Sequence, residues 1–376
     1  MTTIDQRLQK LRARRSGADR AAAVATDQQI EILRKQVLGE AYERRAGGKP
    51  FTRYALGAMQ EVDPDYTRIS VETANRVENQ LRQRLAAEGL NTTYRLQGSV
   101  PLNVHIRGVS DVDLLTIGLG SLYYAPAGVR AQRGDYSPPL RDTLVLLCDL
   151  RRMSEPALRA AFPAVDVDTT NAKAIKLSGG SLARPVDVVP AVWWDTVQYQ
   201  LSGLEHDRGV SIYHKFDNVT IDNLPFLHIK RVSDRDVVAF GSLRKAIRLC
   251  KNVKADSEEE GTVIGLSSFE IAGLLYHADL TALRAGAQWE LGILAETQRH
   301  LDWCYHHPAE AQALMTPDGS RRILDTPEKV TALRRLSMEM DKLLRQVARE
   351  QNAVLYLQES PSLESSRRAV EQLIVQ

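Results

Sequence analysis

The hydrophobic residues follow a helical period near both ends of the chain and a strand period between them. Near the N-terminus, Thr26-Asp-Gln-Gln29 is a capping pattern, and the apolar spacing after it predicts a helix that Gly47-Gly48 ends. A second amphipathic helix is predicted over Val71–Ala87. The C-terminal part of the chain is almost entirely helical in pattern, with helices predicted over residues 241–254 and 326–349.

Four segments between these helical regions have the pattern of strands, because they alternate between apolar and polar residues or are continuously apolar. They are TTYRLQ at 92–97, DVDLLTI at 111–117, AKAIKLS at 172–178 and PVDVVPAVWW at 185–194. A turn at Gly179-Gly180 is expected to join the last two. Strands followed by helices predict an α+β fold, in which a lobe with a mixed central sheet and a helical C-terminal lobe enclose an active-site cleft.

The changes of pattern divide the chain into three segments. Residues 1–60 are predicted to form a charged, helical N-terminal segment, to which the sequence assigns no role. Residues 61–235 are predicted to form the catalytic core, and residues 236–376 a C-terminal helical domain.

The composition is that of an ordinary soluble globular protein, with 376 residues, 43% hydrophobic and 26% charged. A net charge of +2 argues against a general nucleic-acid coat, although it leaves room for a local basic groove. No apolar run approaches the ~18 residues of a membrane span, and no apolar stretch follows the N-terminal charges as in a secretory signal. Three widely spaced cysteines match neither the usual zinc spacings nor a disulfide scaffold. We therefore expect a cytoplasmic protein without a membrane partner.

Two aspartates mark the second predicted strand. Asp111 and Asp113 are two residues apart, so on a strand both side chains project from one face, with their Cβ atoms ~7 Å apart. Val112, between them, then points into the core. Two carboxylates held in this way repel one another unless a cation neutralises them, and Mg²⁺ prefers a few carboxylates together with substrate phosphates. The pair therefore predicts a metal site.

A Gly-Ser step upstream and an aspartate downstream extend this site. Gly98 lets the backbone come close to a ligand, and the hydroxyl of Ser99 and nearby N–H groups can hold a terminal phosphate. Asp187 lies in the middle of the fourth predicted strand, where a buried carboxylate needs a partner. It is expected to bind a second metal ion and to help deprotonate an attacking ribose hydroxyl. Together the motifs predict a site for nucleotidyl transfer that uses two Mg²⁺ ions, for which Mn²⁺ can substitute.

The motifs resemble those of the nucleotidyltransferase superfamily of DNA polymerase β type. QGSVPLNVHIRGVSDVDLL followed by PVDVVPA is similar, within it, to the bacterial enzymes related to cyclic GMP-AMP synthase, the CD-NTases. LRKAIRLCKNVK resembles that family's helix ending in a lysine, and LSSFEIAGLL resembles its Ser-Ser-aromatic helix start. The likeness spans roughly residues 70–277 and implies a polymerase-β-like catalytic lobe.

The resemblance assigns roles to eight residues. It implies that Asp111, Asp113 and Asp187 are the metal ligands and that Gly98 and Ser99 hold the triphosphate. It also implies that Lys251 and Ser268 contact phosphate and that Phe269 stacks on a purine base. Two of these assignments have structural alternatives. Phe269 could be a core aromatic residue, and Lys251 a solvated lysine on a basic helix face.

The chain also departs from the family pattern. Val100 follows the Gly-Ser step where aromatic residues are common, which could change how the loop packs over the phosphates. Nothing matches the His and Cys zinc insertion of the DNA-sensing animal enzyme, so direct activation by DNA is not expected.

The leading hypothesis is a cyclic oligonucleotide synthase. It would join ATP, GTP or other ribonucleoside triphosphates, including a purine, into a cyclic di- or trinucleotide and release pyrophosphate. The resemblance implies a second messenger for antiphage (CBASS) signalling. The alternatives are a template-independent nucleotidyltransferase acting on RNA or a small molecule, and a nucleotide-binding scaffold without catalysis. The bases, the linkage, a regulatory protein partner and the oligomeric state stay open.

Overall fold

The computed structural model describes residues 3–16, 40–139 and 141–375. The chain forms two compact units. Unit 1 comprises Met1–Asp63, Asn103–Ser110 and Val232–Gln376, and unit 2 comprises Pro64–Leu102 and Asp111–Arg231. The helix predicted to begin at Thr26 falls largely on residues 17–39, which lie outside the described residues.

This grouping differs from the three segments predicted from the sequence. The N-terminal segment and the C-terminal helices belong to one unit, because the helices of the first pack on those of the second. The borders near residues 63 and 231 nevertheless fall close to the predicted ones. Since grouping by contacts does not test independent folding, the three segments stay a prediction.

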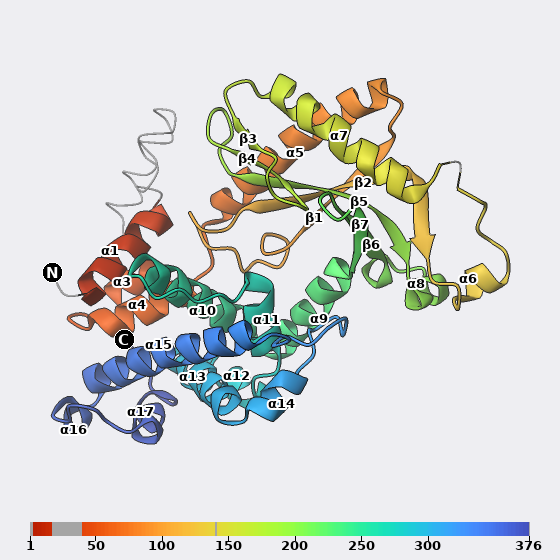
Figure 1. Cartoon of the computed structure of the whole chain (residues 1–376). Helices are drawn as coiled ribbons and strands as arrows, with labels where there is room; N and C mark the ends of the chain where they lie inside the picture. The colour runs from red at the N-terminus through yellow and green to blue at the C-terminus, as the bar shows by residue number, and fades with distance from the viewer. Residues whose placement is uncertain (1–2, 17–39, 140, 376) are drawn as a thin grey trace. The chain divides into compact units, whose positions relative to one another are not determined.

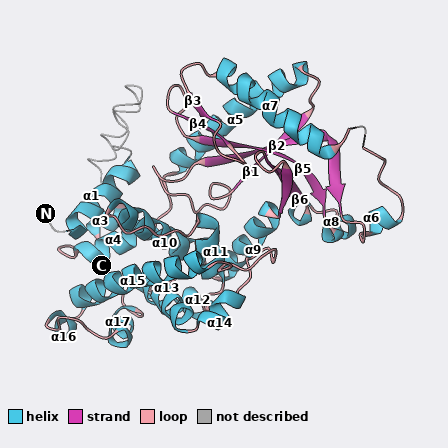
Figure 2. Cartoon of the chain, viewed as in Figure 1, coloured by secondary structure: helices cyan, strands magenta, loops and turns pink. Residues whose placement is uncertain are grey.

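Unit 2 is built on a mixed sheet, which has seven strands within the described residues (Figure 2). They are β1 (Thr92–Gln97), β2 (Val112–Tyr124), β3 (Asp166–Asp168), β4 (Ile175–Ser178), β5 (Val186–Asp195), β6 (Gly209–His214) and β7 (Val219–Asn223). The order is β1-β2-β5-β4-β3, and β6 pairs with β5 and β7. Only the β2–β5 pairing is parallel among these strands. The four predicted strands and the predicted α+β class are confirmed, whereas β3, β6 and β7 were not predicted.

Two long helices, α5 (Pro64–Ala87) and α7 (Thr143–Ala161), cover one face of this sheet (Figure 1). Val112 and Leu114 of β2 pack against them, together with Val186 and Val188 of β5. Leu115 of β2 and Val189 of β5, which follow Leu114 and Val188, point to the opposite face and belong to a second apolar cluster. Shorter helical elements complete the unit: α6 (Val129–Gln132), α8 (Val197–Ser202) and η2 (Glu205–Asp207).

Unit 1 is helical in its described residues. Its helices are α1 (Thr3–Ser16), α3 (Ala41–Arg44), α4 (Pro50–Met59), α10 (Ser242–Glu259), α11 (Ser268–Tyr276), α12 (Leu280–Ala285), α13 (Glu290–His306), α14 (Pro308–Ala313), α15 (Pro327–Gln351), α16 (Ala353–Tyr356) and α17 (Leu363–Val370). Helix α9 (Pro225–Val238) spans the border between the units. The predicted helices over residues 241–254 and 326–349 are confirmed as α10 and α15.

Polar contacts fasten the N-terminal helix inside unit 1. Arg14 of α1 forms an ion pair of 2.7 Å with Asp256 of α10, and the hydroxyl of Tyr54 in α4 donates to the same carboxylate at 2.5 Å. All three side chains are buried, so the network is shielded from water. None of the described helices combines the length and the apolar character needed to cross a membrane.

Candidate active site

A row of polar residues runs across five neighbouring strands of unit 2. Strand pairing places Gln97 of β1 beside Asp113 of β2, Asp113 beside Asp187 of β5, Asp187 beside Lys176 of β4, and Lys176 beside Asp168 of β3. Directly paired residues project from the same face of a sheet. Because Val112 and Leu114 face α5 and α7, this row lies on the opposite face. The structure thus brings two of the predicted aspartates together.

Asp111 joins the row through an ion pair. It directly precedes β2, and its Oδ2 accepts a hydrogen bond of 2.5 Å from Nζ of Lys176. The bond to Asp111 raises the pKa of the Lys176 ammonium, which therefore stays charged. Lys176 was not predicted as a site residue. The alternation of AKAIKLS was the available signal, because burial of Ile175 and Leu177 turns Lys176 to the other face.

Asp187 is the electrostatically least satisfied member of the site. Its Oδ1 is buried and has no hydrogen-bond partner among the described residues. Burial, and then the negative charge of Asp111, raise the pKa of Asp187 to about 6, although Lys176 offsets part of this effect. A carboxylate in this position gains stability from any cation that comes close to it.

Asp168, at the end of the row, is engaged differently. Its Oδ1 accepts a hydrogen bond of 2.7 Å from the backbone N–H of Thr170, and this bond lowers the pKa of Asp168. The carboxylate therefore stabilises the loop that follows β3.

The Gly-Ser turn begins where β1 ends, next to Asp113. Gly98 has φ +76°, and a Cβ atom there would lie 2.3 Å from Oδ2 of Asp113. Both the backbone conformation and the close approach therefore require glycine. Ser99 is half-buried, and Val100 is buried in the core beneath α5 and α7. The buried side chain of Val100 thus anchors the turn in the core, and the carboxylate of Asp113 leaves no space for a side chain at residue 98.

The donor set fits a hard divalent cation. No group of three His, Cys, Asp or Glu side chains in the described part of the chain is arranged as a ready metal site. Lys176 holds one oxygen of Asp111, which is a position where a cation is favourable. The three aspartates supply only carboxylate oxygens, and Oδ1 of Asp187 has no donor among the described residues, so it is available to Mg²⁺, which prefers oxygen ligands.

The three other predicted residues belong to unit 1. Lys251 is 3% exposed, and its Nζ donates to the carbonyl of Val104 at 2.9 Å and to Oγ of Ser110 at 3.1 Å. It therefore fastens the Asn103–Ser110 segment, which lies in the chain between the Gly-Ser turn and Asp111, to α10.

Ser268 and Phe269 open helix α11 of the same unit. Ser268 is exposed, and Ser267 before it forms a capping box with Glu270. Phe269 is half-buried, and the guanidinium of Arg321 lies 5.2 Å from the centre of its ring.

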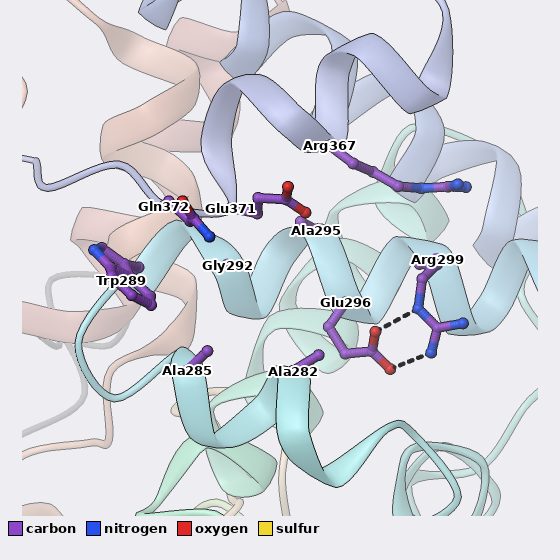
Figure 3. A pocket seen from close by; sticks show the side chains of 10 residues that line it. All are labelled: Ala282, Ala285, Trp289, Gly292, Ala295, Glu296, Arg299, Arg367, Glu371 and Gln372. Atoms are coloured by element: carbon purple, nitrogen blue, oxygen red, sulfur yellow. Dashed lines mark hydrogen bonds and ion pairs between the residues drawn. The ribbon is translucent and has the colours of Figure 1, made fainter.

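A small pocket opens elsewhere in unit 1, between α12, α13 and α17 (Figure 3). Its volume is about 170 Å³, below the ~300–1,000 Å³ of ordinary small-molecule sites. Arg299 makes two hydrogen bonds to Glu296 in its wall (Figure 3). None of the predicted site residues lines it.

Comparisons with known proteins find relatives that match most of the chain. A cyclic dinucleotide synthase CdnE from Yersinia aleksiciae is 43% identical over 355 residues, which cover 92% of each chain. A c-di-GMP synthase from Capnocytophaga granulosa is 34% identical over 75% of this chain and 84% of its own. The solved structure of a STING-associated CdnE c-di-GMP synthase from Flavobacteriaceae sp. superposes with a TM-score of 0.71 at 22% identity, over 92% of this chain and 98% of that chain. No protein-family model matches the chain.

The fold and the carboxylate row define a nucleotidyltransferase with a polymerase-β-like catalytic lobe. Within this class, the chain belongs to the CD-NTase family, and it is an enzyme of the cyclic di- and oligonucleotide synthase kind.

Proposed function

We propose that this enzyme joins two ribonucleoside triphosphates, GTP among them, into a cyclic dinucleotide in an Mg²⁺-dependent reaction, and that the product is a second messenger of antiphage signalling. The observation that carries the proposal is the register of β2 and β5, which pairs Asp113 with Asp187 close to Asp111 and Gly98. Guanine is proposed because relatives of this chain are c-di-GMP synthases.

Asp111, Asp113 and Asp187 are the residues that would hold the metal ions. When bound, Mg²⁺ would neutralise the triphosphate and the charge that develops on it. Gly98 leaves room for the carboxylate of Asp113, and Ser99 would offer its half-buried hydroxyl to a phosphate. These contacts would fix the α-phosphorus for in-line attack.

Asp187 has the properties of a proton acceptor. In the reaction, the ribose hydroxyl oxygen of one nucleotide forms a bond to the α-phosphorus of the other, the bond to pyrophosphate breaks, and the hydroxyl proton must leave. In the metal-free protein Oδ1 of Asp187 is buried and unpartnered among the described residues, and the pKa of this carboxyl is raised to about 6. An oxygen without a donor of its own can accept the hydroxyl proton, whereas a metal ion on the carboxylate would lower this pKa.

The unit 1 residues remain proposals of their own. We propose that Ser268, which is exposed at the start of α11, contacts phosphate and that Phe269 stacks on a base. Stacking would require a base to pack on the Phe269 ring in the presence of the Arg321 guanidinium or in its place. For Lys251, phosphate binding would require its ammonium to exchange Val104 and Ser110 for the nucleotide.

The test is product formation by the pure protein. Radiolabelled ATP, GTP, CTP and UTP are incubated with Mg²⁺ or Mn²⁺, and the mixture is treated with phosphatase. We expect one labelled species that survives phosphatase, requires GTP and is lost in Asp113→Asn, whose fold is checked by thermal unfolding. Asp166→Asn is the matched control, because Asp166 is exposed and lies outside the row. A ladder of long products would instead indicate a template-independent polymerase, and retained turnover in Asp113→Asn would refute the site assignment.

A further inference from the structure

Lys176 is the cation within the carboxylate row. Its Nζ lies 2.5 Å from Oδ2 of Asp111, and strand pairing places the residue beside both Asp187 and Asp168. The ammonium therefore pairs with one carboxylate, and the charges of Asp187 and Asp168 add to the negative potential around it. Its side chain is nevertheless 44% exposed, whereas that of Asp111 is 27% exposed, so the lysine is held by charge rather than by packing.

We propose that Lys176 is a positioning residue that acts through Asp111, standing in for a metal ion in the metal-free enzyme and withdrawing when a divalent cation binds. The inference rests on the proposed role of Asp111 as a metal ligand. A lysine ammonium and a divalent cation compete for the same carboxylate oxygen, because both need contact with it and they repel one another. The open side of Lys176 gives its flexible stem a path away from the row.

Removal of the ammonium should have two effects of opposite sign. The aspartates would repel one another without a neighbouring positive charge, so the metal-free protein would become less stable. The same removal eliminates a competitor and makes the site more negative. A divalent cation should therefore bind more tightly, by about tenfold for a partly exposed charge a few ångströms away.

The test measures Mn²⁺ binding to the full chain by electron paramagnetic resonance in the absence of nucleotide. Lys176→Met is compared with Lys176→Arg, which keeps the charge, and with Lys173→Met, which removes an exposed lysine of the same unit. We expect Mn²⁺ affinity to rise about tenfold in Lys176→Met and to stay near the wild-type value in the other two. Thermal unfolding in EDTA should show a lower melting temperature only for Lys176→Met. In turnover assays the metal concentration for half-maximal rate should fall more than kcat changes.

A measurement on the wild-type protein covers the case in which Lys176→Met does not fold. The acylation rate of the Lys176 amine, followed by mass spectrometry, should rise when Mn²⁺ is added, because the ammonium leaves Asp111. Unchanged or weaker Mn²⁺ binding in Lys176→Met, or a labelling rate that does not rise, would overturn the inference. These readouts do not involve product, so the inference can fail while a cyclic dinucleotide is made. If no such product forms but Lys176→Met still binds Mn²⁺ more tightly than the wild type, only the proposed function fails.

Discussion

Substitution of Asp187 by Asn should stabilise the metal-free enzyme while it inactivates it. In the folded protein the pKa of Asp187 is raised from 3.8 to about 6, because the carboxyl is buried and faces the charge of Asp111. Above pH 6 the folded chain therefore holds a charge that the unfolded chain solvates better. The rise corresponds to about 3 kcal/mol, and partial exposure to solvent reduces the expected effect to about 2–3 kcal/mol.

The sign of the pH dependence follows from proton binding. Between pH 4 and pH 6 the folded state binds the Asp187 proton more strongly than the unfolded state does. Protonation of Asp187 therefore stabilises the folded state fully below about pH 4, and this stabilisation is lost as the pH rises to about 6. The amide in the Asp187→Asn variant does not titrate. The stability difference between the variant and the wild type should therefore be small below about pH 4 and reach its full value above pH 7.

Thermal unfolding in EDTA at several pH values measures this difference. For a unit of about 150–250 residues, 2–3 kcal/mol corresponds to a melting temperature roughly 4–12 °C higher for Asp187→Asn at pH 7.5. Asp166→Asn, which removes an exposed carboxylate from the same sheet, is the control and should show almost no shift. Addition of Mg²⁺ should narrow the gap, because the wild type gains more from it. A variant that is less stable than the wild type at pH 7.5, or a gap that does not grow with pH, would refute the reasoning.

Three further substitutions test the Gly-Ser turn of unit 2 and two polar contacts inside unit 1. Gly98→Ala should cost about 1–2 kcal/mol of stability because residue 98 has a positive φ, and melting curves measure this loss. It should also lower kcat about a hundredfold by displacing Asp113, which turnover assays measure. Lys251→Met should lower the stability of unit 1 by about 2 kcal/mol in the absence of nucleotide, because it removes the donor to Val104 and Ser110; denaturant unfolding without nucleotide checks this, and an unchanged midpoint would contradict it. Tyr54→Phe should cost about 1–2 kcal/mol by the same measurement, because a buried hydrogen bond is lost.

The sequence was sufficient to predict that Asp113 projects away from the core, and the structure shows the same for Asp187. Alternation within β2 and β5 determines this, because Val112 and Val188 must enter the core. It could not predict that the two aspartates are paired, since the register of two parallel strands depends on packing between distant segments. Lys176 was missed for the same reason. Its pattern was visible, but its pairing with Asp187 follows only from the antiparallel register of β4 and β5.

Lys251 shows a different limit of sequence reasoning. Its motif predicted a phosphate contact, and the alternative was a solvated lysine. The structure places its ammonium in a buried position with backbone and hydroxyl acceptors from the Asn103–Ser110 segment. A local helix pattern cannot reveal this contact, because the acceptors lie far earlier in the chain.

The apolar faces of β2 and β5 determine where the aspartates of the site lie. A slip of one residue between these strands would move Val186 and Val188 out of the core and turn Asp187 into it, which would bury a charge and expose two apolar side chains. The register is therefore fixed by burial on the α5 and α7 side. The opposite side is then free to carry the aspartates, where the charge of Asp111 disfavours ionisation of Asp187 and Lys176 offsets part of this effect. The core thus tolerates a site whose own charges oppose folding, and we expect this site to become more stable when a divalent cation binds to it.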